Sequence, residues 1–178
     1  NNGGISQRAL TVEADLEVDR RIMEVNYFGQ VALTKAVLPY MLQQGDGHLV
    51  VLSSLTGKFG FPLRSAYAAS KHALHGFFET LWLENRDHGL RVTLVNPGRI
   101  RTQVSVNALT KDGTPTGKMD PGQAKGMSPK KCANLILAAV HRNQFELTIG
   151  SLGEQFMVWL KRHFPGLFHA LVRKVAAR

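Results

Sequence analysis

The sequence has only one cysteine, Cys132, among its 178 residues. An intrachain disulfide and a cysteine-rich zinc finger are therefore excluded, and a reducing compartment is favoured. No apolar run reaches the roughly 18 residues that a membrane-spanning helix needs. The opening Asn1-Asn2-Gly3-Gly4 does not resemble a secretion signal. We accordingly expect a cytoplasmic protein, which could still associate with a membrane at its surface.

Acidic residues are also scarce, because 22 Lys and Arg face 13 Asp and Glu, giving a net charge of +9. The last acidic residue is Glu154, and basic residues alternate with aromatic and aliphatic ones beyond it. We expect residues 151–178 to form one or two basic amphipathic helices, broken near Pro165-Gly166. Residues 154–178 would then either touch an anionic membrane or pack their aromatic side chains on a subunit interface. A recognised nucleic-acid-binding motif is missing, so we expect no nucleic-acid partner.

Repeats and low-complexity linkers are missing too, so the chain is interpreted as one unit over about 1–150 followed by the C-terminal segment 151–178. Short apolar runs predict buried strands at 48–52, 90–95 and 145–149. Helical spacing predicts helices at about 18–44, 65–87 and 129–141, with Ser65 and Ser128 as caps. Helices that alternate with strands in this way predict an α/β fold with a parallel sheet.

Residues 99–127 lack sustained periodicity and follow the carboxyl end of a predicted strand. Open α/β sheets bind ligands at that edge, so we expect this long connection to be a substrate lid. Phe59 and Phe61 before Tyr67, and Val104 and Met119 in the connection, could line a site for an apolar substrate, or could simply pack the lid.

Tyr67 and Lys71 are four residues apart near the start of a predicted helix, which places them on one face. A nearby ammonium favours a phenolate and lowers the tyrosine pKa, so the pair could act as a general acid and base. Ser54 ends a predicted strand, where its hydroxyl could donate a hydrogen bond to a carbonyl oxygen. His72 and His75 lie three apart, but a third ligand is missing, so we expect no metal site.

The order of five pieces resembles the short-chain dehydrogenase/reductase family over about residues 1–150. They are Asn1-Asn2-Gly3-Gly4, Asn26, Ser54, Tyr67-x-x-x-Lys71 and Pro97-Gly98-x-Ile100-x-Thr102. The stretches 53–58 and 105–108 most resemble the branch of the 11β-hydroxysteroid dehydrogenases and the dehydrogenase/reductase member 7 group. The resemblance implies a Rossmann-like, doubly wound parallel sheet whose N-terminal half is absent from this chain.

By this resemblance the protein is an NAD(P)-dependent oxidoreductase that interconverts a hydrophobic alcohol and its ketone or aldehyde. Tyr67 would exchange a proton with the substrate, Lys71 would hold the nicotinamide ribose, and Ser54 would bind the substrate oxygen. Asn26 would hold a water in a proton relay. The cofactor would also contact the backbone near Pro97, Gly98 and Ile100, the Thr102 hydroxyl, and Asn1 and Gly3 beside the adenosine half.

The glycine-rich turn with which the family cradles the pyrophosphate does not occur here. We therefore expect the chain to be the C-terminal part of a longer polypeptide, and the charge leans to NADP over NAD. The resemblance also implies a homodimer or homotetramer that pairs the helices near 20–44 and 65–87. The alternative function is an inactive dehydrogenase-like scaffold that acts as a basic membrane-surface or interaction protein.

Overall fold

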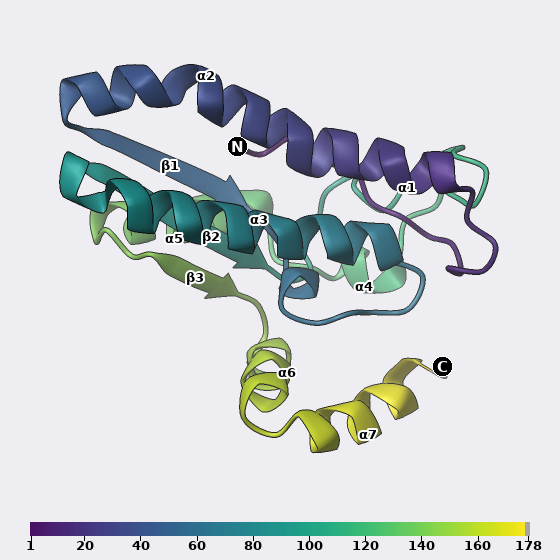
Figure 1. Cartoon of the computed structure of the whole chain (residues 1–178). Helices are drawn as coiled ribbons and strands as arrows, with labels where there is room; N and C mark the ends of the chain where they lie inside the picture. The colour runs from purple at the N-terminus through teal and green to yellow at the C-terminus, as the bar shows by residue number, and fades with distance from the viewer. Residues whose placement is uncertain (177–178) are drawn as a thin grey trace.

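The computed structural model describes residues 1–176, with side chains placed for 1–172. Three parallel strands form its sheet: β1 (Gly47–Leu52), β2 (Leu90–Pro97) and β3 (Glu146–Ile149), in the order β1-β2-β3. The sequence prediction of a parallel α/β sheet is therefore confirmed. All three strands end at the same edge of the sheet, so the residues that follow them share that edge (Figure 1).

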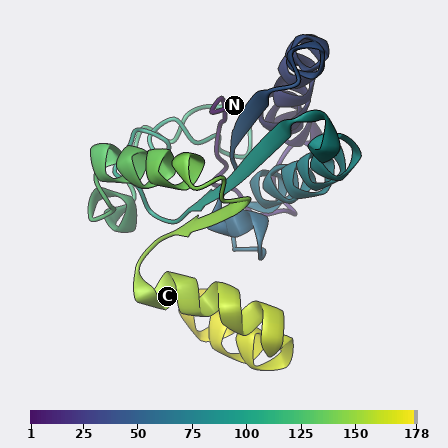
Figure 2. The ribbon, with the colours of Figure 1, turned by 90° about the vertical axis from the view of Figure 1, so that its left-hand side faces the viewer.

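Helices cover both faces of this sheet (Figure 2). On one face lie α2 (Gly29–Gln44) and α3 (Ser65–Asn85), and on the other lies α5 (Pro129–His141). The core between the sheet and α2 and α3 is apolar, with Val51, Leu74, Phe78 and Leu94 fully buried. A second core packs Val95 and Ile149 against α5. This two-sided burial explains why the strands are almost continuously apolar.

The predicted helix at 18–44 is continuous but is interrupted by one π-helical turn. α1 (Leu16–Met23) continues through a π-helical turn (Glu24–Phe28) into α2. α2 ends at Gly45, whose φ of +66° stops the helix. Gly89, with φ +81°, lies so close that a Cβ on it would collide with the Gly45 carbonyl oxygen. Glycine is therefore needed where the two helix-to-strand turns meet.

The helix caps agree with the sequence prediction in one case and differ in the other. Ser128 caps α5 as expected, accepting a hydrogen bond from Lys131 N. Ser65, predicted as a cap, is instead the first helical residue of α3. The fully buried Gln7 takes over this role, because its Oε1 accepts a hydrogen bond from Ala66 N at 3.0 Å. A short-range pattern cannot reveal a cap supplied from 59 residues away.

The connection 99–127 is mostly irregular, with one short helix, α4 (Pro121–Ala124). Its two ends are joined by a parallel bridge between Ile100 and Met127, and its middle is held by a parallel bridge between Leu109 and Gln7. Leu109 is buried among Val18, Ile22 and Ala66, so this part of the connection packs into the body of the protein.

The C-terminal segment forms a hairpin of two helices, α6 (Leu152–His163) and α7 (Pro165–Ala176), as the break near Pro165 predicted. The hairpin follows β3 and lies beyond the edge of the sheet (Figure 1). Leu160 and Phe168 attach it to Leu55 and Phe59. The basic side chains of Arg173, Lys174 and Arg178 lie beyond residue 172, the last residue whose side chain is described. Within residues 1–176, no helix combines the length and apolar character needed to cross a bilayer.

The outer side of the sheet at β1 is covered in part by the first residue. The Asn1 amino group donates to Val50 O at 2.9 Å, and Leu52 N donates to Asn1 O at 3.0 Å. The chain thus begins alongside β1 and runs toward its carboxyl end.

Candidate active site

Ser54 lies just beyond β1, at the carboxyl edge of the sheet. Its Oγ accepts hydrogen bonds from Thr56 N at 3.2 Å and from Thr56 Oγ1 at 3.0 Å. Because both of these bonds use the oxygen as acceptor, the Ser54 proton can be donated to another group. The serine is thereby oriented as a donor, the property needed to bind a carbonyl oxygen.

Tyr67 and Lys71 occupy successive turns at the start of α3. The Lys71 Nζ lies 5.9 Å from the centre of the Tyr67 ring and donates to Leu52 O at 2.7 Å. Burial lowers the pKa of Lys71 to about 8. The two side chains point to the same side of the helix, as the sequence spacing predicted.

Asn26 lies in the π-helical turn and is fully buried. Its Oδ1 accepts from Ile5 N at 2.7 Å, and its Nδ2 donates to Ile5 O and to Ser70 Oγ. Ser70 Oγ in turn donates to Tyr67 O. The Asn26 side chain therefore holds the N-terminal segment against α3, and its predicted part in a water relay stays a prediction.

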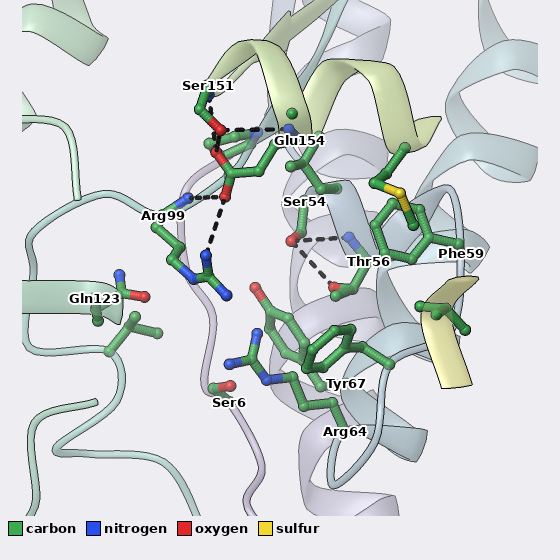
Figure 3. A pocket seen from close by; sticks show the side chains of 18 of the residues that line it. Ser6, Ser54, Thr56, Phe59, Arg64, Tyr67, Arg99, Gln123, Ser151 and Glu154 are labelled. Atoms are coloured by element: carbon green, nitrogen blue, oxygen red, sulfur yellow. Dashed lines mark hydrogen bonds and ion pairs between the residues drawn. The ribbon is translucent and has the colours of Figure 1, made fainter. Parts of the chain in front are cut away.

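Two cavities meet at Ser54 and Tyr67. One, of about 370 Å³, lies toward α6 and α7 and is called the outer cavity here (Figure 3). The other, of about 550 Å³, lies toward α5 and is called the inner cavity. Ser54, Tyr67, Pro97 and Gly98 line both, while Lys71 lines only the inner one. The two hydroxyls thus stand on the boundary between two spaces.

Most of the residues predicted to contact a cofactor surround the inner cavity. Pro97, Gly98, Ile100 and Thr102 line it together with Tyr67 and Lys71. Asn1 and Gly3 do not, because Asn1 bonds to β1 and Thr34, and Gly3 O accepts from Gln30. Their neighbours Asn2 and Gly4 line the cavity in their place. The predicted contacts of Asn1 and Gly3 with the adenosine half of the cofactor stay a prediction.

The inner cavity narrows beside Gly4. A Cβ at this position would lie 3.3 Å from Asn26 Oδ1 and 3.5 Å from Lys71 Nζ. A side chain here would therefore fill the space in front of the Lys71 ammonium. The glycine leaves that ammonium accessible from the cavity.

The pKa of Tyr67 reflects opposing influences. Burial raises the pKa of this phenol, whereas hydrogen bonding with Ser54 and the charges of Arg64 and Arg8 lower it. Sequence reasoning expected Lys71 to supply the lowering charge. The charges of two arginines, Arg64 and Arg8, lower the pKa of the phenol from the outer side, and the predicted effect of Lys71 stays a prediction.

These arginines were not among the site residues predicted from the sequence. Arg64 directly precedes α3 and lines the outer cavity with Arg8 and Arg99. Burial lowers the pKa of Arg64 to about 10. Figure 3 shows Arg64 and Arg99 beside Tyr67, on the side away from Ser54. The sequence signal was available, since Arg64 is three residues before Tyr67 and Arg99 follows Pro97-Gly98 directly.

The carboxylate of Glu154 closes the outer cavity opposite Tyr67. It accepts from Ser151 N at 2.9 Å, and it lies so close to Gly98 that a Cβ there would approach it to 2.9 Å. Glu154 thereby joins α6 to the end of β2. A helix that sequence reasoning placed outside the catalytic unit therefore contributes part of the site wall.

The sequence left open whether these apolar residues line a site or pack the connection, and the structure places some of them on a cavity wall. Phe59, Phe61 and Val104 line the outer cavity. Met119 lines neither cavity. Leu55, Met157 and Val172, which sequence reasoning did not single out, complete the apolar wall.

The two predicted non-ligands, His72 and His75, bond to protein groups. His72 Nδ1 is 2.8 Å from Ala68 O, and His75 Nε2 is 2.9 Å from Asn96 Oδ1. Across residues 1–176, no three His, Cys, Asp or Glu side chains gather in the manner of a metal site.

Comparison with known proteins identifies the same family that the sequence motifs resemble. Residues 1–113 match the family described as short chain dehydrogenase. The chain is 45% identical, over all of its length, to the Bos taurus dehydrogenase/reductase SDR family member 7B. It is 44% identical, again over its whole length, to a Drosophila melanogaster dehydrogenase/reductase SDR family protein 7-like. It covers 55% of each, so the chain spans about half the length of these relatives.

A solved structure agrees. A short-chain dehydrogenase from Burkholderia cenocepacia, crystallised in complex with NADP, superimposes with a TM-score of 0.81 at 25% identity. The match covers 97% of this chain and 66% of that one. The arrangement of helices around the parallel sheet is thus that of a Rossmann-like fold, of which this chain forms a part.

Proposed function

The chain belongs to the short-chain dehydrogenase family, and on that premise we propose that it carries the catalytic half of an NAD(P)-dependent oxidoreductase. The proposed reaction interconverts a hydrophobic alcohol and its ketone or aldehyde. The observation that carries the proposal is the position of Ser54 and Tyr67 on the boundary of two cavities. A hydride transfer needs two ligands that meet at one point, with proton-exchanging groups at that point.

The inner cavity suits a nicotinamide cofactor on the chemistry of its wall. Lys71 and the Thr102 hydroxyl are hydrogen-bond donors suited to ribose and carboxamide groups, and Ile100 and Pro97 offer apolar contacts. Gly4 leaves the Lys71 ammonium open to the cavity. When bound, the cofactor would supply or accept the hydride. We propose NADP over NAD because the chain is basic, and the Burkholderia relative was crystallised with NADP.

The outer cavity would take the substrate, with its reacting oxygen between Ser54 and Tyr67. The Ser54 hydroxyl, held by Thr56, would donate a hydrogen bond to that oxygen. In reduction Tyr67 would give its proton to the oxygen as negative charge develops there, and in oxidation it would take the proton back. Leu55, Phe59 and Met157 would contact the apolar part of the substrate.

The substitution Tyr67→Phe tests this proposal in the full-length polypeptide. We expect turnover with an apolar alcohol to fall by roughly three to four orders of magnitude, on the scale of general acid-base catalysis. Affinity for NADPH, measured by fluorescence titration, should stay nearly unchanged because the phenyl ring keeps the shape of the wall. Tyr40→Phe on the exposed face of α2 is the matched control.

Equal turnover in the Tyr67→Phe and parent proteins would remove Tyr67 from the mechanism. Absence of both turnover and nicotinamide binding in the parent protein would favour the alternative, an inactive scaffold that acts through its surface.

We also propose a homodimer or homotetramer that pairs the outer faces of the long helices. Leu33 and Tyr40 on α2 and Leu83 on α3 are each more than half exposed. Leu74 and Phe78 of α3 are buried in the core, so they take no part in this contact. Analytical ultracentrifugation that finds only monomer would contradict the proposal, whereas loss of the oligomer in Tyr40→Glu would support it.

The outer face of the C-terminal hairpin favours a second proposal, contact with an anionic membrane. Phe156, Trp159 and Phe164 are about half exposed, and their rings adjoin one another. Arg162 and His163 lie next to them in the sequence. We expect Trp159→Ala to reduce salt-sensitive pelleting with phosphatidylserine vesicles, and pelleting that ignores both salt and Trp159 would contradict the proposal.

A further inference from the structure

Arg64 has an unusual place for a cation. It is the residue that immediately precedes α3, where the aligned peptide dipoles produce a positive potential and disfavour positive charge. Its side chain is only 24% exposed. Its guanidinium lies 5.5 Å from the centre of the Phe61 ring, and the nearby carboxylate is Asp120, at 3.4 Å. A buried cation at a helix N-terminus is a cost to folding that calls for a compensating function.

Asp120 neutralises the positive charge of Arg64 only in part. One oxygen, Asp120 Oδ2, is shared between Arg64 and Arg8, and Arg8 holds it more closely. Glu154, the carboxylate that lines the outer cavity, lies within 4.0 Å of Arg99. Three arginines and one carboxylate, Glu154, thus line the outer cavity, and Asp120 is shared by two of the arginines. This leaves an excess of positive charge beside Tyr67.

Tyr67 lies in the first turn of α3 and lines the outer cavity together with these three arginines. The charged groups near the phenol are Arg8 on the N-terminal segment, Arg64 immediately before α3, Lys71 on α3, Arg99 after β2 and Glu154 on α6, with Asp120, before α4, paired to Arg8 and Arg64. Lys71 is on the inner side, and Arg64 and Arg8 are on the outer side. The pKa of Tyr67 agrees with this geometry, because the charges of Arg64 and Arg8 lower it.

We propose that Arg64 is a positioning residue for the reaction, whose positive charge on the substrate side of Tyr67 stabilises the phenolate form. This role rests on the proposed function of Tyr67 as the group that exchanges the proton. Arg64 acts through Tyr67, so it changes the pH at which the phenol titrates rather than the strength with which substrate binds. An opposite charge within about 4–6 Å typically lowers the pKa of an acid by about 1–3.

The first test needs no turnover. In the full-length polypeptide, the absorbance of tyrosinate is followed against pH, and the Tyr67→Phe trace is subtracted to isolate Tyr67. We expect Tyr67 to titrate at higher pH in Arg64→Gln, and at nearly the parent pH in Arg64→Lys. Arg86→Gln removes an exposed cation at the other end of α3 and should leave the titration unchanged.

A variant with the opposite sign protects the test against misfolding of Arg64→Gln. Asp120→Asn removes the carboxylate shared by Arg64 and Arg8, so Tyr67 should titrate at lower pH than in the parent protein. A Tyr67 titration that is the same in the parent, Arg64→Gln and Asp120→Asn proteins would overturn the proposal.

The second test uses the pH profile of alcohol oxidation. We expect Arg64→Gln to move the basic rise of kcat/KM to higher pH. At a fixed pH below the rise, the rate should fall roughly tenfold for every pH unit by which the rise moves. An increase in KM with no displacement of the profile would also overturn the proposal, since Arg64 would then bind the substrate directly. If the proposed function itself is wrong, turnover will be absent in every variant. The absorbance titration will still measure the effect of Arg64 on Tyr67, so the two failures can be told apart.

Discussion

Phe168 is the residue on which attachment of the C-terminal hairpin most depends. Its side chain is 2% exposed, and its ring centre lies 5.2 Å from that of Phe59. The other fully buried residue of the hairpin, Leu160, belongs to the same cluster. Replacing a buried phenylalanine with alanine removes its transfer free energy and leaves a cavity, which together cost about 3–5 kcal/mol. Phe168→Ala should therefore remove most of the stabilisation that this cluster gives to α6 and α7.

The loss should be local rather than global. The hairpin leaves β3 beyond the sheet edge, and its cluster with Leu55 and Phe59 is separate from the cores on either face of the sheet. In the full-length polypeptide we expect amide hydrogen exchange to accelerate by two to three orders of magnitude in 152–172. Exchange in β2 should stay the same. Met157 and Val172 line the outer cavity, so KM for an apolar substrate should rise as well.

The matched control is Phe164→Ala, the same substitution four residues earlier. Phe164 is 52% exposed, so its removal should cost less than about 1 kcal/mol and leave hydrogen exchange in α6 almost unchanged. Equal acceleration in both variants, or none in Phe168→Ala, would refute the reasoning that burial of Phe168 holds the hairpin in place.

Two further predictions concern stability. Because burial lowers the pKa of Lys71 to about 8 while the unfolded side chain titrates near 10.5, the unfolded state binds more protons between these pH values. The free energy of unfolding of the parent protein should therefore rise with pH across this window. Lys71→Met should be more stable than the parent at pH 7, and this advantage of up to about 3 kcal/mol should disappear by pH 10.5. Urea unfolding measures the difference, and Lys35→Met at an exposed position should not show it. Gln7→Ala should destabilise the protein by about 1–3 kcal/mol, because it leaves the buried Ala66 N–H without its partner. Thermal unfolding would show this loss, and Gln155→Ala on the surface of α6 should change stability by less than about 0.5 kcal/mol.

Elements with local signals were predictable from the sequence. The strands at 48–52 and 90–95 were found because both faces are covered by helices, which makes their apolar runs nearly continuous. The start of α5 followed from Ser128-Pro129, since both residues act within the first turn. The same locality applies to Tyr67 and Lys71, which helical geometry alone brings to one face.

Features that depend on distant parts of the chain were not predictable in this way. Gln7 caps a helix that begins 58 residues later, and neither residue type nor spacing indicates the pairing. The amide of Asn26 in the π-helical turn bonds to Ile5 and Ser70, which come from two other segments. The C-terminal hairpin was assigned to a separate segment because its own pattern is amphipathic, yet Glu154 packs on Gly98 inside the site.

The electrostatics of Tyr67 follow from this long-range assembly. Burial at the junction of two cavities raises the pKa of the phenol, and so opposes the deprotonation that oxidation requires. The sequence places a compensating lysine four residues on, but burial also lowers the pKa of that lysine to about 8, so its charge weakens as the pH rises. An arginine keeps its charge over the same range even when burial lowers its pKa to about 10. A site that must stabilise a phenolate above neutral pH therefore gains from an arginine on the substrate side, and Arg64 holds that position.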